Sequence, residues 1–169
     1  KYTSEVIGRS TASITTRDAY FGPSAFVDLI HQIQLEITGA DISFAAPLSF
    51  DERINKGDIL IRDMFRLYRF ENFLYEVKMT GSEVDKYLEH SYGLWLNTMK
   101  DKGDYLLKYR TREDNSLQLS NGMARLRNAS YNFDSAMGIS YTVDVTRPEG
   151  DRVTVSSLAD GSPFTPDST

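Results

Sequence analysis

Cysteine is absent from the chain of 169 residues, and histidine occurs only as His31 and His90. Without cysteine there is no disulfide scaffold, no thiolate metal site and no cysteine nucleophile. Two histidines are too few for the usual hydrolytic metal centre, which collects several histidine and carboxylate ligands. The Gly-x-Ser-x-Gly elbow, the glycine-rich phosphate loop and the dinucleotide fingerprint are missing as well. The residue inventory therefore favours binding over chemistry.

Long apolar runs are also lacking, since no stretch approaches the roughly 20 residues that a membrane helix needs. The first four residues contain neither an initiating methionine nor the apolar core of a signal peptide. We therefore expect a processed or excised piece of a longer polypeptide. With 19 basic and 24 acidic residues the net charge is −5, which disfavours a general binder of nucleic acid or anionic lipid.

Two stretches have the periodicity of amphipathic helices. In the first, apolar residues recur at steps of three and four, at Phe26, Val27, Ile30, Ile33 and Ile37. Gly39 follows as a stop signal, which predicts a helix at about 23–38 with one buried stripe. In the second, Thr80 and Glu83 have the spacing of a capping box, ahead of one helical face with Val84, Tyr87, Leu88, Ser91 and Trp95. This pattern predicts a helix at 81–93, with an extension as far as Met99 left open.

Alternating and β-branched residues predict strands at 41–45 and 73–79, a strand or extended entry segment at 4–16, a strand or turn at 58–61, and a C-terminal hairpin of 139–145 with 152–155. Phe73, Tyr75, Val77 and Met79 alternate with their neighbours, which predicts a central or near-central strand. Asp63 is expected to cap a short helical turn at 64–68. The chain thus indicates one α+β domain over residues 1–169, in which a mixed β-sheet packs with two main α-helices beside the C-terminal β-hairpin.

Six short motifs, in the order in which they occur, resemble the C-terminal domain of the 5′-nucleotidases. They are Gly22-Pro23-Ser24-Ala25-Phe26, Gly39-Ala40-Asp41-Ile42-Ser43, Gly57-Asp58-Ile59, Leu67-Tyr68-Arg69-Phe70-Glu71-Asn72, Met79-Thr80-Gly81-Ser82-Glu83 and Gly138-Ile139-Ser140-Tyr141-Thr142-Val143-Asp144. That family includes UDP-sugar hydrolases, 2′,3′-cyclic-nucleotide phosphodiesterases and animal ecto-5′-nucleotidase. The six motifs are most similar to those of the Bacteroidetes-type members, and the resemblance covers roughly residues 5–165.

The resemblance implies a division of labour within a longer polypeptide. A separate N-terminal metallophosphatase domain would hold two divalent metals and catalyse hydrolysis, while this domain binds the nucleoside or nucleotide. The resemblance also implies a bacterial protein in the periplasm, secreted or on the cell surface, with no nucleic-acid partner and no membrane insertion. The family's final strand would follow Thr169, so we expect a domain truncated at its C-terminal end.

Phe70 matches one of two aromatic rings that, in the family, hold the base between them. A stacking ring is suitable for this task because every base has a π-face. The alternative is that Phe70 is an ordinary core aromatic. Asn72, in the same motif, is a second candidate for substrate binding. The other ring of the pair would lie beyond Thr169.

Arg17 matches a family arginine that reaches the substrate phosphate, a role that the guanidinium fork serves well. The alternative is a solvated arginine that pairs with Asp18 or Glu5. The family's Asn-Gly-Gly-Gly-Ile-Arg type loop is lost here, because Ala45 stands for its asparagine and Phe50 for its arginine. Arg53 is close enough in sequence to substitute for that arginine.

Several other residues admit a functional reading but are more typical of structure. Arg62, Arg66 and Arg69 form a row that is more often the wet side of a helix than an anion site. His31 and His90 are expected as a partly buried or a surface imidazole. The helical spacing of Tyr92, Trp95 and Tyr105 favours a role in packing over a role in lining a pocket.

Three functional hypotheses remain. The first is a substrate-recognition domain for nucleosides or nucleotides in a 5′-nucleotidase-type metallophosphoesterase. The second is a non-catalytic binding module that retains the fold with altered or lost nucleotide specificity. The third is an autonomous hydrolase, which would require metal-dependent turnover by the chain alone.

Overall fold

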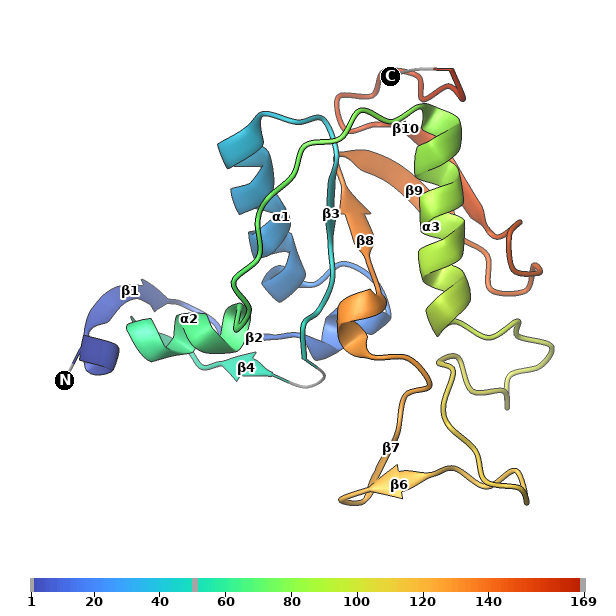
Figure 1. The fold of residues 1–169 in the computed structure, drawn as a ribbon, viewed down its shortest axis with the longest axis horizontal. Coiled ribbons are helices and arrows are strands. Elements are labelled where there is room, and N and C mark those ends of the chain that lie inside the picture. Colours follow the sequence, from blue (N-terminus) through green and yellow to red (C-terminus); the bar gives the residue numbers. More distant parts are fainter. Residues whose placement is uncertain (1, 50–51, 168–169) are drawn as a thin grey trace.

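The computed structural model describes residues 2–49 and 52–167 and has an α+β architecture (Figure 1). The helices are α1 (Ala25–Thr38), α2 (Ile61–Leu67) and α3 (Gly81–Trp95), with 3-10 turns η1 (Tyr2–Ser4), η2 (Arg17–Tyr20) and η3 (Ser130–Asn132). The strands are β1 (Val6–Ser10), β2 (Ile14–Thr15), β3 (Ser43–Ala45), β4 (Arg53–Ile54), β5 (Gly57–Leu60), β6 (Leu119–Ser120), β7 (Met123–Ala124), β8 (Ser135–Met137), β9 (Ile139–Val143) and β10 (Val153–Leu158). The predicted α+β class with two main helices and a C-terminal hairpin is confirmed, whereas the mixed β-sheet that was also predicted is not formed, since every ladder among the described residues is two-stranded and antiparallel.

The strands pair in five two-stranded antiparallel ladders, namely β1 with β5, β2 with β4, β3 with β8, β6 with β7 and β9 with β10. The β3–β8 ladder stands between α1 and α3, and the β9–β10 hairpin lies against α3 (Figure 1). Gly138 joins β8 to β9 at a φ of 101°, and a Cβ there would lie 2.0 Å from the carbonyl oxygen of Asp41. Only glycine therefore allows β3 to approach this junction so closely.

Helix α1 covers the predicted range but buries less of its stripe than expected. Gly39 ends the helix in the left-handed region, where its N–H donates to the Leu35 carbonyl oxygen at 2.8 Å. Phe26 and Val27 are buried in a cluster with Ala19, Ala45 and Ile54. Ile33 and Ile37 are exposed, so the prediction of a fully buried stripe is wrong for the second half of α1. That half borders an open groove beside β3.

Helix α3 begins at the predicted capping box. The Thr80 N–H donates to Glu83 Oε2 at 2.7 Å, and the Glu83 N–H donates to Thr80 Oγ1 at 3.3 Å. The helix continues two residues past its predicted end at 93, to Trp95. Val84 and Leu88 are buried against β10, which confirms the predicted inner face.

A buried polar lock holds the predicted β9–β10 hairpin to α3. Glu89 Oε1 accepts the backbone N–H groups of Arg152 at 2.5 Å and Val153 at 2.6 Å. The fully buried Arg152 guanidinium donates to the Leu96 carbonyl oxygen at 2.9 Å and to Thr98 Oγ1 at 3.0 Å. Since these groups are removed from water, their hydrogen bonds fix the hairpin's position on the helix.

The prediction of a central strand at 73–79 is wrong. Residues 71–80 follow an irregular, open path between α2 and α3 and join none of the five ladders (Figure 1). The exposed fractions of Phe73, Tyr75 and Val77 are 85%, 77% and 72%. The path runs beside β3 and α1 but leaves between them the groove, with a volume of about 660 Å³. The groove lies between the segment and β3, and the two do not pair.

Smaller predictions also changed. The predicted extended stretch 4–16 is divided into β1 and β2, and the turn expected at 64–68 is α2, which starts three residues earlier. Asp63 accepts the Leu60 N–H at 2.9 Å and so does provide a cap. Residues 97–128 form a protruding arm that carries β6 and β7. No element was predicted for 100–128, and the helix extension as far as Met99, which was left open, stops at Trp95.

Candidate functional site

Phe70 lies just beyond the end of α2 and is half exposed, with an exposed fraction of 46%. Its nearest aromatic neighbour is Tyr131 of η3, edge-on at 77° with ring centroids 6.5 Å apart. Tyr131 is itself 57% exposed. Phe70 is therefore not a core residue, and a ring from outside has access to it.

Arg69 precedes this ring and is held by the loop before β4. Its Nη2 donates to Ser49 Oγ at 2.8 Å and lies 3.5 Å from Glu52 Oε1. Arg66, by contrast, is on α2 and reaches Asp63 at 3.9 Å. The predicted arginine row is thus divided, because Arg69 lies past the end of the helix and turns toward a different element.

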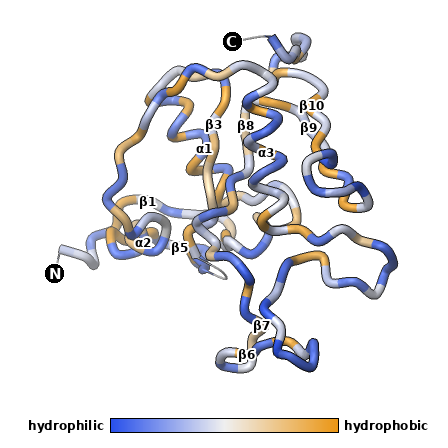
Figure 2. Tube along the Cα trace, turned by 45° about the vertical axis from the view of Figure 1, so that its right-hand side comes forward, coloured by the Kyte–Doolittle hydropathy of each residue, from blue (hydrophilic) through white to orange (hydrophobic). Residues whose placement is uncertain are grey.

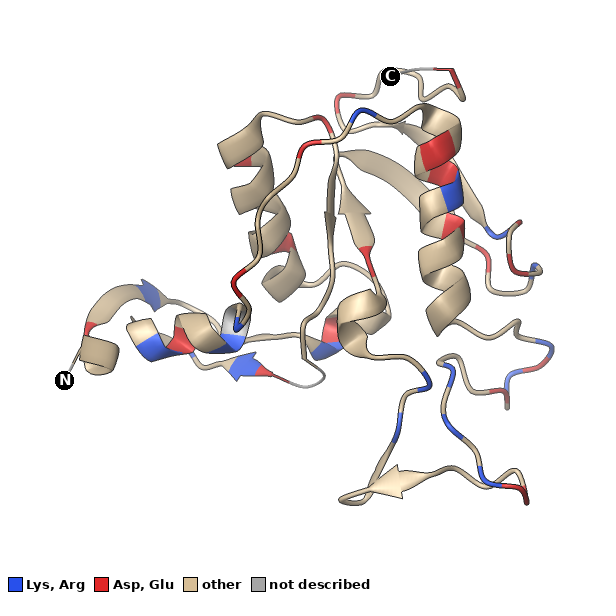
Figure 3. Ribbon diagram, viewed as in Figure 1, with Lys and Arg blue, Asp and Glu red and all other residues tan. Residues whose placement is uncertain are grey.

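A backbone link brings Arg17 and Arg53 toward the same loop. The buried Thr16 donates its N–H to the Glu52 carbonyl oxygen at 3.0 Å and accepts the Glu52 N–H at Oγ1 at 2.9 Å. Thr15 and Arg53 are partners in the β2–β4 ladder. Arg17 directly follows Thr16 in the chain, and Arg53 directly follows Glu52. Both residues are therefore next to the backbone link at Glu52, the residue that Arg69 contacts. Figure 3 shows basic residues at β4, at η2 and at the end of α2.

We call Arg17, Arg53, Arg69, Phe70 and Tyr131 the recognition corner. The three arginine residues lie on three segments that the backbone joins near Glu52, the Arg69 guanidinium contacts Glu52, and the Phe70–Tyr131 pair of rings follows Arg69. All three arginine residues are exposed to solvent. Such a corner can stack a flat ring and attract a phosphate.

The remaining site candidates lie in other settings. Asn72 donates from Nδ2 to the Tyr68 hydroxyl at 3.0 Å, within its own loop. Ala45 is buried in β3, opposite Ser135. Phe50 lies outside the described residues. Sequence reasoning did not single out Tyr131, and nothing in the spacing of the chain connects it with Phe70.

His31 is buried between α1, β3 and β8 and is fully occupied by serine hydroxyls. Ser43 Oγ donates to Gln34 Oε1 at 2.5 Å, so it accepts from His31 Nδ1, which lies 2.9 Å away. His31 Nε2 is then the acceptor for Ser135 Oγ at 3.3 Å. Burial lowers the pKa of His31 from 6.5 to about 4. This neutral imidazole joins the helix to both strands, whereas His90 is exposed.

Of the other aromatic candidates, Trp95 packs in the core, Tyr92 is part-buried and lines the cavity between η2 and β9, and the packing interpretation is wrong for Tyr105. Trp95 is buried with Tyr20, Leu107 and Phe133, and the Tyr92 hydroxyl meets that of Tyr141 at 2.8 Å. Tyr105 is exposed and lies edge-on to Tyr109. Neither the groove beside β3 nor a second cavity of about 510 Å³ between η2 and β9 is lined by the recognition corner.

Over residues 2–49 and 52–167, no group of three histidine, aspartate or glutamate side chains is placed to hold a metal ion. In the same ranges, none of the helices is long and apolar enough to cross a membrane.

The model of the 5′-nucleotidase C-terminal domain family matches residues 6–169, and the chain belongs to this family. It is 26% identical to a 2′,3′-cyclic-nucleotide 2′-phosphodiesterase/3′-nucleotidase of Haemophilus influenzae over 172 residues, which cover 88% of this chain and 24% of that protein. It is 37% identical to the trifunctional nucleotide phosphoesterase YfkN of Bacillus subtilis over 95 residues, or 56% of this chain and 6% of that protein. The chain thus spans about a quarter or less of the length of these relatives.

Two solved structures share the fold. A putative 5′-nucleotidase of Staphylococcus aureus superimposes on 98% of this chain with a TM-score of 0.71 and 20% identity, over 30% of its own length. A 5′-nucleotidase precursor of Thermus thermophilus gives a TM-score of 0.67 and 19% identity, over 99% of this chain and 28% of its own. These structures confirm the fold class expected from the sequence, and the family model confirms the expected family.

Proposed function

We propose that the recognition corner binds the nucleoside and phosphate of a nucleotide, so that this chain positions substrate for a 5′-nucleotidase-type metallophosphoesterase. The observation that carries the proposal is the accessible Phe70 ring next to Arg69, with Arg17 and Arg53 at the same loop. Stacking on an aromatic ring is worth about 1–3 kcal/mol and tolerates different bases. Guanidinium forks add charge-assisted hydrogen bonds to phosphate.

Hydrolysis itself is assigned to another part of the parent polypeptide, together with the two divalent metals that the resemblance implies. The greater length of the relatives leaves room for such a part. Within this division the present chain holds base and phosphate in place, and orientation of this kind lowers the barrier to the chemical step. A secreted or periplasmic location belongs to the same proposal, supported by the structural neighbour described as a precursor.

Isothermal titration of the 169-residue chain with adenosine, uridine, AMP and UMP tests the proposal. Phe70→Ala is expected to weaken binding of nucleosides and nucleotides alike, by about fivefold to 150-fold. Phe73→Ala is the matched control, because this neighbouring phenylalanine is more exposed and lies outside the corner. It is expected to leave affinity unchanged.

The phosphate contact has its own variant. Arg69→Gln is expected to weaken AMP binding about tenfold or more while leaving adenosine unaffected. Arg66→Gln is the control, since its guanidinium reaches only Asp63 in the described structure. If Phe70→Ala and Phe73→Ala behave alike, the corner does not recognise nucleotides.

A second candidate function is favoured by one observation. Ala45 is packed in the core cluster, so this position offers no amide to a base. A binding module that keeps the fold and has lost nucleotide specificity would show equal, weak responses to every ligand in the titration. Metal-dependent phosphatase turnover by the isolated chain would instead support an autonomous hydrolase, and we expect none.

A further inference from the structure

The arm of residues 97–128 has the opposite charge balance to the rest of the chain. It contains seven lysine and arginine residues against four aspartate and glutamate residues, whereas the remainder contains twelve against twenty. The arm projects from the base of α3, and Figure 3 shows basic residues along both of its sides. The arm therefore concentrates positive charge on an otherwise acidic molecule.

The backbone register sorts the side chains of the arm into two faces. Arg110 N–H donates to the Arg125 carbonyl oxygen, and Arg127 N–H donates to that of Lys108, both at 2.8 Å. These bonds flank the antiparallel bridge between Tyr109 and Leu126. Residues opposite one another, and residues two apart on one strand, share a face.

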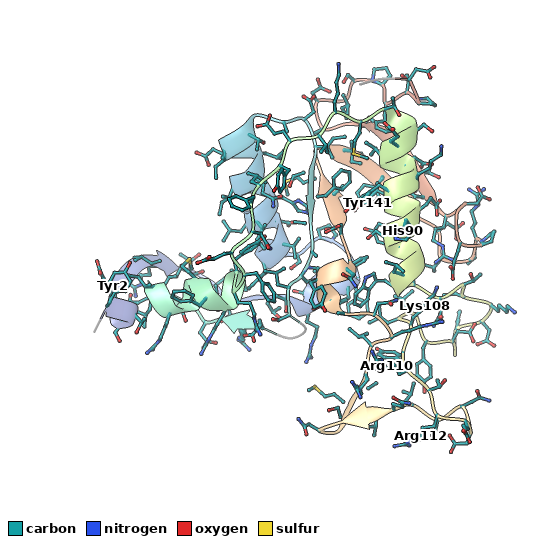
Figure 4. All side chains as sticks on the ribbon, in the orientation of Figure 1. Tyr2, His90, Lys108, Arg110, Arg112 and Tyr141 are labelled. Atoms are coloured by element: carbon teal, nitrogen blue, oxygen red, sulfur yellow. The ribbon has the colours of Figure 1, made fainter. Side chains whose placement is uncertain are left out.

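Lys108, Arg110, Arg125 and Arg127 consequently lie on one face, which we call the basic face. Tyr109 and Leu126 occupy the other face and pack against the buried cluster around Trp95. Because the apolar side is directed inward, the basic face is directed outward. Figure 4 labels Lys108, Arg110 and Arg112 along one strand of the arm.

Three of these cations are unpaired. In the described part of the chain, the guanidinium groups of Arg110, Arg125 and Arg127 make no hydrogen bond or ion pair. Lys108 is the exception, since its Nζ donates to the Gly93 carbonyl oxygen at 2.5 Å and to Glu149. Like charges directly opposite one another destabilise a ladder. An anion between the two strands would remove that repulsion.

We propose that the basic face binds a chain of phosphate groups. The Cα atoms that carry these cations are expected about 5.5 Å apart across the ladder and about 6.6 Å apart along each strand. A single anion would contact only one guanidinium group, whereas linked phosphate groups contact several guanidinium groups at once. The acidic remainder of the molecule confines such a ligand to the arm.

Glu149 competes with this ligand. It lies in the turn between β9 and β10 and is the only acidic partner of the basic face among the described residues. The cations of the arm hold its carboxyl group ionised, since hydrogen bonding from Lys108 lowers the pKa of Glu149, with a smaller contribution from Arg127. Removal of this carboxylate releases Lys108 for the phosphate chain.

The test is fluorescence anisotropy of a labelled eight-nucleotide oligothymidylate, with inorganic polyphosphate as competitor. The double variant Arg110→Gln/Arg125→Gln is expected to bind at least about tenfold more weakly at 50 mM salt. The slope of log affinity against log salt should become shallower by about one to two. Glu149→Gln is expected to bind about twofold to fivefold more tightly.

Lys100→Gln/Lys102→Gln is the matched control, because it removes the same charge from exposed positions of the arm outside the basic face. It is expected to change affinity less than about twofold. Unchanged circular dichroism and melting temperature ensure that each variant is folded. Equal losses in the two double variants would overturn the proposal, because net charge alone would then explain binding.

A comparison of several ligands in this experiment distinguishes the possible sources of phosphate. Competition by polyphosphate at equal phosphate concentration supports recognition of the phosphates alone, and tighter binding of the oligonucleotide supports a nucleic-acid ligand on the same face. Preference for phosphatidylserine vesicles or for an acidic peptide over both would overturn the proposal. The thymine bases of the oligonucleotide can stack on Phe70, so polyphosphate, which has no base, is the ligand that separates the two sites. Arg110→Gln/Arg125→Gln should weaken polyphosphate binding, a result that does not depend on base recognition at the recognition corner.

Discussion

Residues 73–79 and strand β9 carry the same alternating apolar pattern but have opposite surroundings. Ile139, Tyr141 and Val143 of β9 turn one face to α3, and the backbone pairs with β10 from Val143↔Val153 to Ile139↔Leu158. Residues 73–79 pair with no described strand and expose most of their side chains. Figure 2 shows hydrophobic residues in both regions.

The difference teaches that alternation predicts an extended chain and not its partner. Strand β10 follows β9 after one short turn, so closing that loop costs little entropy. The partner that residues 73–79 would need is distant in sequence, and the groove beside β3 separates the two. One pattern therefore yields a paired strand where the partner is local, and an open segment where it is not.

The largest expected difference between the two regions is in amide hydrogen exchange. We expect the amides of β10 to exchange at least about a thousandfold more slowly than those of residues 73–79, because only the former have ladder partners. Exchange followed by mass spectrometry on overlapping peptides measures both regions in one sample. Equal protection would mean that residues 73–79 are paired in solution.

A core substitution comes next in size. Leu88→Ala removes a fully buried side chain that packs beneath β10, and it should lower the free energy of unfolding by about 2–5 kcal/mol. Val77→Ala is the control in the open segment and should cost less than about 0.5 kcal/mol. Urea denaturation of both variants provides the comparison. Similar losses would show that the open segment is part of the core.

The third prediction concerns β3, which His31 joins to α1 on one side while the groove lies on the other. The pKa of His31 is lowered from 6.5 to about 4 by burial, so between these values the unfolded chain takes up a proton that the folded chain refuses. Its contribution is complete above pH 6.5 and is lost as pH falls to 4, by about 3 kcal/mol.

His31→Gln isolates this contribution from that of other titrating groups. The stability difference between the wild type and this variant should shrink by about 3 kcal/mol from pH 7 to pH 4, measured by urea denaturation. His90→Gln, at an exposed position, should keep the wild-type pH dependence. A difference that stays constant with pH would contradict the buried, neutral imidazole.

Local signals were sufficient to predict the start of α3 and the end of α1. Thr80 with Glu83, and Gly39 with its left-handed backbone, act within one turn of chain, so the sequence contains the whole determinant. The hairpin was predicted for the same reason. Whether residues 73–79 pair depends on packing elsewhere, which no local pattern records.

The site was only half predictable. Phe70 and Arg17 of the proposed site were predicted from the family resemblance and Arg53 from its position near the lost loop arginine, but Arg69 was interpreted as part of a helical row, and the helix ends at Leu67. Tyr131 approaches Phe70 through tertiary packing alone. The basic face could not be predicted from the sequence, because it depends on which residues face one another across isolated β-bridges.

The most direct test of the recognition corner is a nuclear magnetic resonance titration of the isotope-labelled chain with AMP. We expect the largest amide shifts at residues 17, 53, 69–72 and 131, with little change in residues 73–79 or in the arm. Shifts confined to the groove, the hairpin or the arm, or no shift at all up to millimolar nucleotide, would contradict the proposed role of Phe70 and its arginines.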